Sequence, residues 1–251
     1  MKALVFASRN IKEILRDPMS YVFCLGLPIV MLVVFYGVFY SQEAYWFSLE
    51  TLTPGIAVFS LSFSMLFMAL LVSKDRATSF LSRLYVSPMK TADYILGYSV
   101  PGIAIAVGQV VACYLTAIII GHIVGTPLSL TGSALAIIST IPAIIMFVGF
   151  GILLGSIFSD KAAPGICSIL ITLSGFLSGA WMRIDPGTAL NTVASVFPFH
   201  PAVSISRVAL NTSQATFVNF GGYLVTVCLY AGVVVVLSVA AFSAKMRSDN
   251  A

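Results

Sequence analysis

Charged side chains are scarce in this chain of 251 residues: only 9% of its residues are Asp, Glu, Lys or Arg, whereas 59% are hydrophobic. Soluble domains carry about 25% charged residues. A soluble fold of this composition would expose more apolar surface than a monomer tolerates, and a disordered chain would be far less hydrophobic. The sequence therefore excludes a soluble enzyme and predicts an integral membrane protein.

Motifs for nucleotide or metal chemistry are also missing. The dipeptide Gly-Lys, which a phosphate-binding loop requires, does not occur, and the two histidines, His122 and His200, are far apart. The cysteines all fall in apolar stretches: Cys24, Cys113, Cys167 and Cys228. Disulfide frameworks and zinc sites need clustered cysteines, so we expect these four to be buried packing residues. We predict no catalytic residue, metal site or cofactor site in this chain.

Long uncharged stretches predict the architecture, because a membrane-spanning helix needs about 20 apolar residues. A turn at 125–129 divides the longest stretch. The predicted spans are 19–41, 54–73, 94–121, 133–158, 163–181 and 222–243. The predicted fold class is all-α, a polytopic membrane protein that forms one domain over residues 1–251 and has no room for a second soluble domain.

Carboxylates are absent from all six predicted spans. Intramembrane hydrolases and ion-coupled transporters usually place acidic side chains there. We therefore expect any transport by this chain to be driven by another protein.

Basic residues predict the orientation. If both termini are cytoplasmic, eleven of the 13 Lys and Arg residues lie on the cytoplasmic side, and only Arg183 and Arg207 lie outside. This asymmetry is the one expected from the positive-inside rule. We predict a multi-pass protein of the plasma membrane with both termini in the cytoplasm. In a membrane protein the location of the Lys and Arg residues matters more than the net charge of +4, and we expect membrane lipid, not nucleic acid, as a partner.

Residues 1–18 form the first of three segments outside the predicted spans. Apolar residues recur there at helical spacing: Leu4, Ala7, Ile11, Ile14 and Leu15. Arg9, Lys12 and Arg16 lie largely on the other side, and Pro18 ends the pattern. This predicts a helix in the cytoplasmic membrane interface, which could be simply an anchor.

The loop 74–93 is the longest predicted cytoplasmic connection. Its apolar residues are spaced as on one face of a helix: Phe80, Leu81, Leu84 and Tyr85. Arg76 and Arg83 accompany them, and Pro88 ends the helix. An amphipathic helix of this kind could lie on lipid headgroups or fill a groove on another protein.

The third segment, 182–221, is apolar but is not a predicted span, and it contains Pro186, Pro198 and Pro201. Irregular backbone at membrane depth must be covered by protein or face a water-filled cavity. We predict short re-entrant helices that cover the outer end of a pathway.

Small and polar residues inside the spans have two possible roles. Ser60, Ser62 and Ser64 alternate in the second span, Gln109 lies in the third, and Gly151 and Gly155 form a small-xxx-small pair in the fourth. We favour helix packing through interhelical hydrogen bonds over substrate contact.

Three passages resemble the permease subunits of ABC-2 type (ATP-binding cassette) exporters, in particular drug and antibiotic exporters. In chain order they are RNIKEILRDP at 9–18; TPG at 53–55 with KDRAT at 74–78, LSRL at 81–84 and VSP at 86–88; and GFLSGAW at 175–181 with FPFHPAV at 197–203 and Arg207. Each passage is degenerate alone. Their order and spacing over six spans make the resemblance specific, and it covers nearly the whole chain.

The resemblance implies a transmembrane subunit that pairs with a second copy or a paralogue and with two cytoplasmic ATPase subunits, which bind ATP and Mg²⁺. The interfacial helix would include Arg9, Lys12, Arg16 and Asp17. The coupling helix, seated in an ATPase groove, would use Asp75, Arg76, Phe80, Leu81, Arg83, Leu84, Tyr85 and Pro88. The outer gate would include Trp181, Phe197, His200 and Arg207.

The predicted function is ATP-driven export of a hydrophobic or amphipathic substrate, such as a drug, a lipid-like molecule or a peptide antibiotic. Export of a polysaccharide or teichoic acid is the alternative within transport. The alternative outside transport is an immunity or sensory membrane protein. In each case the chain itself is not an enzyme.

Overall fold

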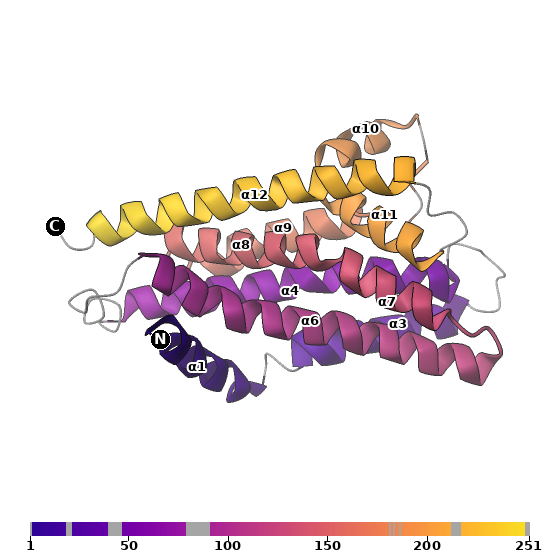
Figure 1. Cartoon of the computed structure of the whole chain (residues 1–251), viewed down its shortest axis with the longest axis horizontal. Coiled ribbons are helices and arrows are strands. Elements are labelled where there is room, and N and C mark those ends of the chain that lie inside the picture. The colour runs from indigo at the N-terminus through magenta and orange to yellow at the C-terminus, as the bar shows by residue number, and fades with distance from the viewer. Residues whose placement is uncertain are drawn as a thin grey trace.

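A computed structural model describes residues 2–18, 22–39, 47–78, 91–180, 182, 184–185, 187–211 and 217–248. All regular elements within these ranges are helices, which confirms the all-α prediction (Figure 1). In chain order the helices are α1 (Lys2–Leu15), a π-helical turn (Val22–Gly26), α3 (Leu27–Phe39), α4 (Leu49–Ala77), α6 (Thr91–Val124), α7 (Leu130–Ser139), α8 (Ile141–Ile157), α9 (Ala163–Leu177), α10 (Ala189–Val196), α11 (Phe199–Leu210) and α12 (Phe217–Ser248).

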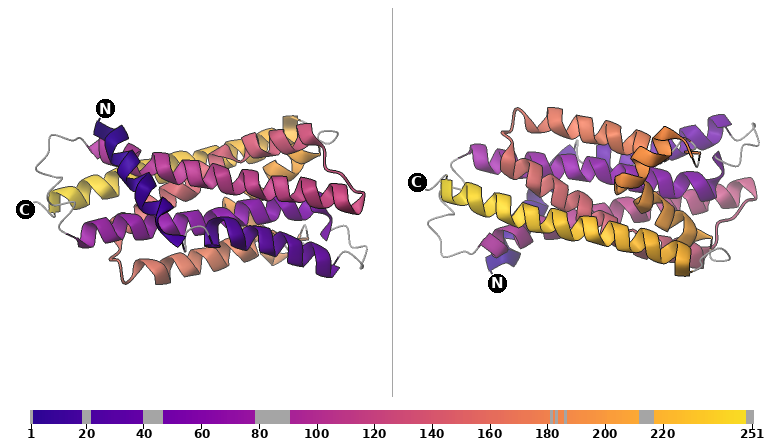
Figure 2. Two further views of the ribbon diagram at one scale, coloured as in Figure 1. Left: turned by 90° about the horizontal axis from the view of Figure 1, so that it is seen from below. Right: turned by 90° about the horizontal axis from the view of Figure 1, so that it is seen from above.

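The long helices lie side by side along one axis, and α1 crosses them obliquely (Figures 1 and 2). The beginning of α1 and the end of α12 lie at the same end of this bundle, which we call the terminal end. The turn after α6 and the short helices α10 and α11 lie at the other end, which we call the far end.

Five helical stretches of the described ranges are long and apolar enough to cross a membrane. They are Val22–Phe39, Leu49–Ala77, Thr91–Val124, Leu130–Ile157 and Phe220–Lys245. A sixth crossing results if α10 and α11, which are bent by 89° at their junction, are counted as one span. The chain is therefore a multi-pass membrane protein.

Two predicted spans differ from the helices in the structure. The segment 133–158 is broken at Thr140, between α7 and α8, because Pro142 at the start of α8 cannot donate a backbone hydrogen bond to the preceding turn. The segment 163–181 contains α9, which has only 15 residues, fewer than a straight span needs. Gly179, at φ 65°, lies just beyond α9 in the left-handed region that commonly follows a helix end.

Helix α4 forms the centre of the bundle, since 21 of its 29 residues are buried. It contacts α3, α6, α8, α9 and α11. Two glycines of α8 face its backbone: a Cβ at Gly151 would lie 2.6 Å from the carbonyl oxygen of Met65, and one at Gly155 would lie 2.6 Å from that of Ala69. The packing role predicted for this glycine pair is confirmed.

Polar side chains in the core also serve packing. The Gln109 amide nitrogen donates to the carbonyl oxygen of Ser60 at 2.7 Å, and the Ser64 hydroxyl donates to the Gln109 amide oxygen at 2.5 Å. The hydroxyls of Ser60 and Ser62 bond to carbonyl oxygens of their own helix. The contacts of Gln109 join α4 to α6, as the helix-packing interpretation predicts, whereas the hydroxyls of Ser60 and Ser62 form no bond between helices.

One of the cysteine predictions is wrong. Cys24, Cys113 and Cys167 are buried, but Cys228 is exposed on α12. Helix α12 is apolar around most of its circumference and buries only a minor part of it, so an apolar neighbourhood in the sequence does not imply burial within the protein.

Candidate functional site

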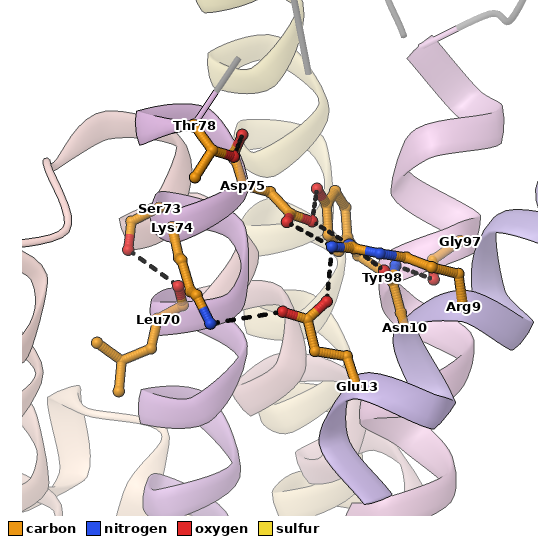
Figure 3. Close-up of polar contacts among 10 residues, drawn as sticks. All are labelled: Arg9, Asn10, Glu13, Leu70, Ser73, Lys74, Asp75, Thr78, Gly97 and Tyr98. Atoms are coloured by element: carbon orange, nitrogen blue, oxygen red, sulfur yellow. Dashed lines mark hydrogen bonds and ion pairs between the residues drawn. The ribbon is translucent and has the colours of Figure 1, made fainter. Parts of the chain in front are cut away.

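A buried carboxylate lies in the last turn of α4, at the terminal end. The Asp75 side chain is only 4% exposed and accepts two hydrogen bonds from the Arg9 guanidinium of α1, at 2.7 and 3.0 Å (Figure 3). The Tyr98 hydroxyl of α6 donates to the same carboxylate at 2.9 Å. One acidic side chain therefore joins three helices, and we call Asp75, Arg9 and Tyr98 the Asp75 cluster.

Further polar contacts surround the cluster. Glu13 of α1 accepts from Arg9 at 2.7 Å and lies 3.6 Å from the Lys74 ammonium. The side chain of Asn10, which is fully buried, donates to the carbonyl oxygen of Gly97 at 3.0 Å. Helix α1 is thereby fixed to both α4 and α6.

The charges in the cluster stabilise each other. Partial burial alone would lower the pKa of the Arg9 guanidinium, but its hydrogen bond to Asp75 and the negative charges of Asp75 and Glu13 raise that pKa above its ordinary value. A bidentate bond between a guanidinium and a carboxylate is among the stronger and more geometrically specific hydrogen-bonded pairs. The cluster therefore suits a fixed mechanical connection between helices.

Arg76, the residue after Asp75, bonds to a different part of the bundle. Its guanidinium donates to the carbonyl oxygens of Gly155, at 3.0 Å, and Phe158, at 3.4 Å, where α8 ends. A cation is favourable at a helix C-terminus. Since Asp75 contacts α1 and α6 while Arg76 contacts α8, the last turn of α4 is held by three helices.

The predicted coupling residues fall into two groups. Asp75 is brought together with Arg9 of α1, whereas Arg76 bonds to the end of α8. The others lie outside the described residues: Phe80, Leu81, Arg83, Leu84, Tyr85 and Pro88. The segment that carries them follows the fixed last turn of α4 after two residues.

Helix α1 packs differently from the prediction. Of the predicted apolar face, Ala7 and Ile14 are buried, but Leu4 and Leu15 are 68% and 55% exposed. The buried side is centred instead on Asn10 and on Phe6, whose ring lies edge-on to Tyr94 and Tyr98 of α6, with centroids 5.8 and 4.9 Å apart. Lys12 and Arg16 are exposed, and Asp17 is half-buried.

Arg207 of α11 forms a second polar connection, at the far end. Its guanidinium donates to the carbonyl oxygens of Thr51 at 3.1 Å, Gly179 at 2.8 Å and Ala180 at 3.4 Å. It thus joins α11 to the beginning of α4 and to the turn after α9.

The other predicted gate residues are less closely connected to this contact. Phe197 is 37% exposed and stacks on Phe199, with ring centroids 6.1 Å apart, and His200 is half-buried. Trp181 lies outside the described residues. The sequence did not predict two buried contacts of the Ser206 hydroxyl. It lies 2.8 Å from the Tyr114 hydroxyl of α6 and 3.2 Å from the Thr140 hydroxyl, at the break between α7 and α8. Both contacts hold α11 in the bundle.

Replacement of Arg207 with Met should lower the free energy of unfolding by about 2 kcal/mol, because three carbonyl oxygens lose a charged donor. In a chain of this size that corresponds to a fall of about 4–8 °C in Tm. Thermal unfolding of the purified chain in nanodiscs measures this change. Arg207→Lys should recover part of the loss, and an unchanged Tm for Arg207→Met would contradict the role of this contact.

Comparison with known proteins identifies the family. A family model described as ABC-2 type transporter matches residues 2–211, which include α1 to α11 and both polar connections. No curated protein matches the chain.

Proposed function

Because the chain belongs to the ABC-2 type transporter family, we propose that it is the permease subunit of an ATP-driven exporter of hydrophobic or amphipathic molecules. In this proposal the chain pairs with a second copy or a paralogue, and the export path lies between the two. Separate cytoplasmic ATPase subunits bind ATP and Mg²⁺. The terminal end of the bundle faces the cytoplasm, as the distribution of basic residues predicts.

The observation that carries the proposal is that α4 is held at both of its ends. Its 29 residues correspond to about 43 Å, which exceeds the thickness of the hydrocarbon core. At the terminal end Asp75 and Arg76 connect it to α1, α6 and α8, and at the far end Thr51 accepts from Arg207. If the last turn of α4 is displaced, the contact between Thr51 and Arg207 at the far end would therefore move as well.

This arrangement supports a mechanical role in transport. The predicted coupling segment, 74–93, would dock on an ATPase subunit, and closure of the ATPase pair would push on the last turn of α4. Because Asp75 and Arg76 connect this turn to three other helices, the push would rotate the bundle as a rigid body. Arg207 would pass that rotation to α11 and to the turn after α9.

The polarity of the bundle supports an apolar substrate. Gln109 and the serines of α4 already have hydrogen-bond partners within the protein, so they do not form a free polar site for a sugar or a phosphate. Among the buried side chains of the described ranges, Asp75 at the terminal end is the one charged residue, and an interior otherwise without charge suits a cargo that partitions into lipid.

Leu84→Asp tests the proposal at the predicted coupling helix. When the chain is co-expressed with a candidate ABC ATPase from the same genome, we expect the variant to lose at least about tenfold in co-purified ATPase, because a charge enters an apolar groove. The matched control is Leu130→Asp, an exposed position at the far end. Equal co-purification for both variants would contradict the docking site.

The transport reaction is tested on the wild-type complex in nanodiscs. Hydrophobic drugs, phospholipids and a teichoic acid precursor are added separately, and ATP hydrolysis is measured. Stimulation by a drug or a lipid supports the proposed substrate class. Stimulation by the polymer precursor alone overturns that class, and no stimulation by any compound favours a function outside transport.

A further inference from the structure

Helix α1 has an outward face, most of whose residues take no part in the Asp75 cluster. Leu4 and Val5 are 68% and 73% exposed there, and Leu15 is 55% exposed. Lys12 and Arg16 lie on the same side. Large aliphatic side chains beside basic ones are typical of a helix surface that contacts lipid headgroups and the upper part of the acyl chains.

The basic residues of α1 differ in their partners. Arg9 is engaged by Asp75 and Glu13, and Glu13 is also close to Lys74. The side chains of Lys12 and Arg16, in contrast, make no hydrogen bond or ion pair with any residue in the described ranges. The outward face therefore presents two uncompensated positive charges.

An open hollow of about 750 Å³ lies along this face, with Leu4 and Val5 toward the beginning of α1 and Lys12 and Arg16 toward its end. Ser8 and the paired side chains of Arg9 and Glu13 also line it. Its position relative to the membrane follows from the chain: the first candidate span begins at Val22, six residues after Arg16. The basic end of the hollow is therefore close to the level at which a span enters the bilayer.

We propose that this outward face binds the headgroup of an anionic phospholipid. The phosphate would lie between Lys12 and Arg16, and the acyl chains would cover Leu4 and Val5. Charge complementarity favours an anionic lipid over a zwitterionic one, and the exposed aliphatic side chains favour a lipid over a soluble anion. Such a site would anchor α1, and through Arg9 and Asp75 it would make the position of α4 sensitive to lipid composition.

The test compares two double variants that remove the same charge. Lys12→Gln with Arg16→Gln removes the proposed site. Lys161→Gln with Lys245→Gln removes two basic residues elsewhere at the terminal end. Each full-length chain is purified in detergent and titrated with phosphatidylglycerol, phosphatidylcholine or soluble glycerol phosphate, and binding is measured by native mass spectrometry.

We expect the wild type to bind phosphatidylglycerol more tightly than phosphatidylcholine. The Lys12 and Arg16 variant should lose roughly 25-fold in phosphatidylglycerol affinity, since each basic residue near a lipid surface contributes about fivefold. The control should change less than about twofold. Equal losses in both variants would overturn the site, and wild-type binding of glycerol phosphate as tight as that of the lipid would show a free-anion site instead.

Two further measurements keep the result separate from the proposed transport function. Thermal unfolding in phosphatidylcholine nanodiscs establishes that both variants are folded. ATPase co-purification with the same variants distinguishes a lipid from a protein: loss of the ATPase with unchanged phosphatidylglycerol binding would overturn the lipid site and assign the face to an acidic protein surface. Lipid binding itself needs no ATPase, so it can fail or succeed independently of export.

Discussion

Asp75→Asn should lower the free energy of unfolding by about 2–3 kcal/mol and reduce Tm by about 5–10 °C. The reason is that the carboxylate accepts from Arg9 and Tyr98 in a site where it is only 4% exposed. Loss of one partner of a fully buried ion pair costs about 3–5 kcal/mol. We expect less here, because Arg9 is 36% exposed and keeps its contact with Glu13. Thermal unfolding in nanodiscs measures the change.

A double-mutant cycle with Arg9→Gln assigns the effect to the pair. Arg9→Gln alone should cost at least as much as Asp75→Asn, since it leaves the more deeply buried charge without its cation. The double variant should be more stable than the sum of the two losses predicts, by about 1–3 kcal/mol. Strict additivity would show that the two side chains do not act as a pair.

The same variant has a functional outcome if α4 transmits the ATPase motion. Asp75→Asn should retain the ATPase subunits but lose about tenfold in substrate-stimulated hydrolysis, because α1 and α6 no longer follow the last turn of α4. Ser73→Ala is the matched control, since the Ser73 hydroxyl donates to the carbonyl oxygen of Leu70 in its own helix and bonds to no other helix in the described ranges. Full stimulation in Asp75→Asn would exclude a coupling role for the cluster.

The fold could be predicted from the sequence wherever one physical cause dominated. A long uncharged stretch has to lie in lipid as a helix, and for this reason the predicted spans 54–73 and 94–121 fall inside α4 and α6. The break at Thr140 and the early end of α9 depend on single residues, Pro142 and Gly179, within stretches that are uniformly apolar. A prediction from hydrophobicity alone does not detect that a helix breaks or ends at such residues.

The candidate site could be predicted only in part. The motif that contains Asp75 and Arg76 indicated a functional segment, but Arg9 is 66 positions from Asp75, and no local pattern connects them. Tyr98 and Asn10 resemble packing residues in the sequence. The sequence did contain one signal for the pair, a carboxylate close to the end of an uncharged span. A carboxylate buried there is stable only when a cation pairs with it.

Helix α1 illustrates the same limit at the level of one element. Its residues form two apolar surfaces, one with Leu4 and Leu15 and one with Phe6 and Ile14. The spacing of apolar residues does not show which of the two surfaces is buried against the bundle. The structure buries the second, because Phe6 has two aromatic partners on α6 and Asn10 can reach the carbonyl oxygen of Gly97.

Larger side chains at the contact between α4 and α8 should destabilise the bundle more than larger side chains at exposed helix positions. Gly151→Leu and Gly155→Leu each place a side chain where even a Cβ would lie 2.6 Å from a carbonyl oxygen of α4. Overpacking of a close-packed contact costs about 1–3 kcal/mol, and a leucine against backbone belongs at the upper end of that range or beyond it. We therefore expect the double variant to lose about 4 kcal/mol or more, seen as a large loss of monodisperse protein in size-exclusion chromatography.

Gly108→Leu and Gly232→Leu provide the matched control. Both positions lie in exposed parts of long helices, and a Cβ at either one would meet no heavy atom within 4 Å. Leucine has the higher helix propensity, so this double variant should be as stable as the wild type or more stable by about 1 kcal/mol. If the two double variants accumulate and unfold alike, α4 and α8 are not in backbone contact. A push on the last turn of α4 would then have no close-packed helix to move with it, and the rigid-body transmission proposed for α4 would fail with the contact.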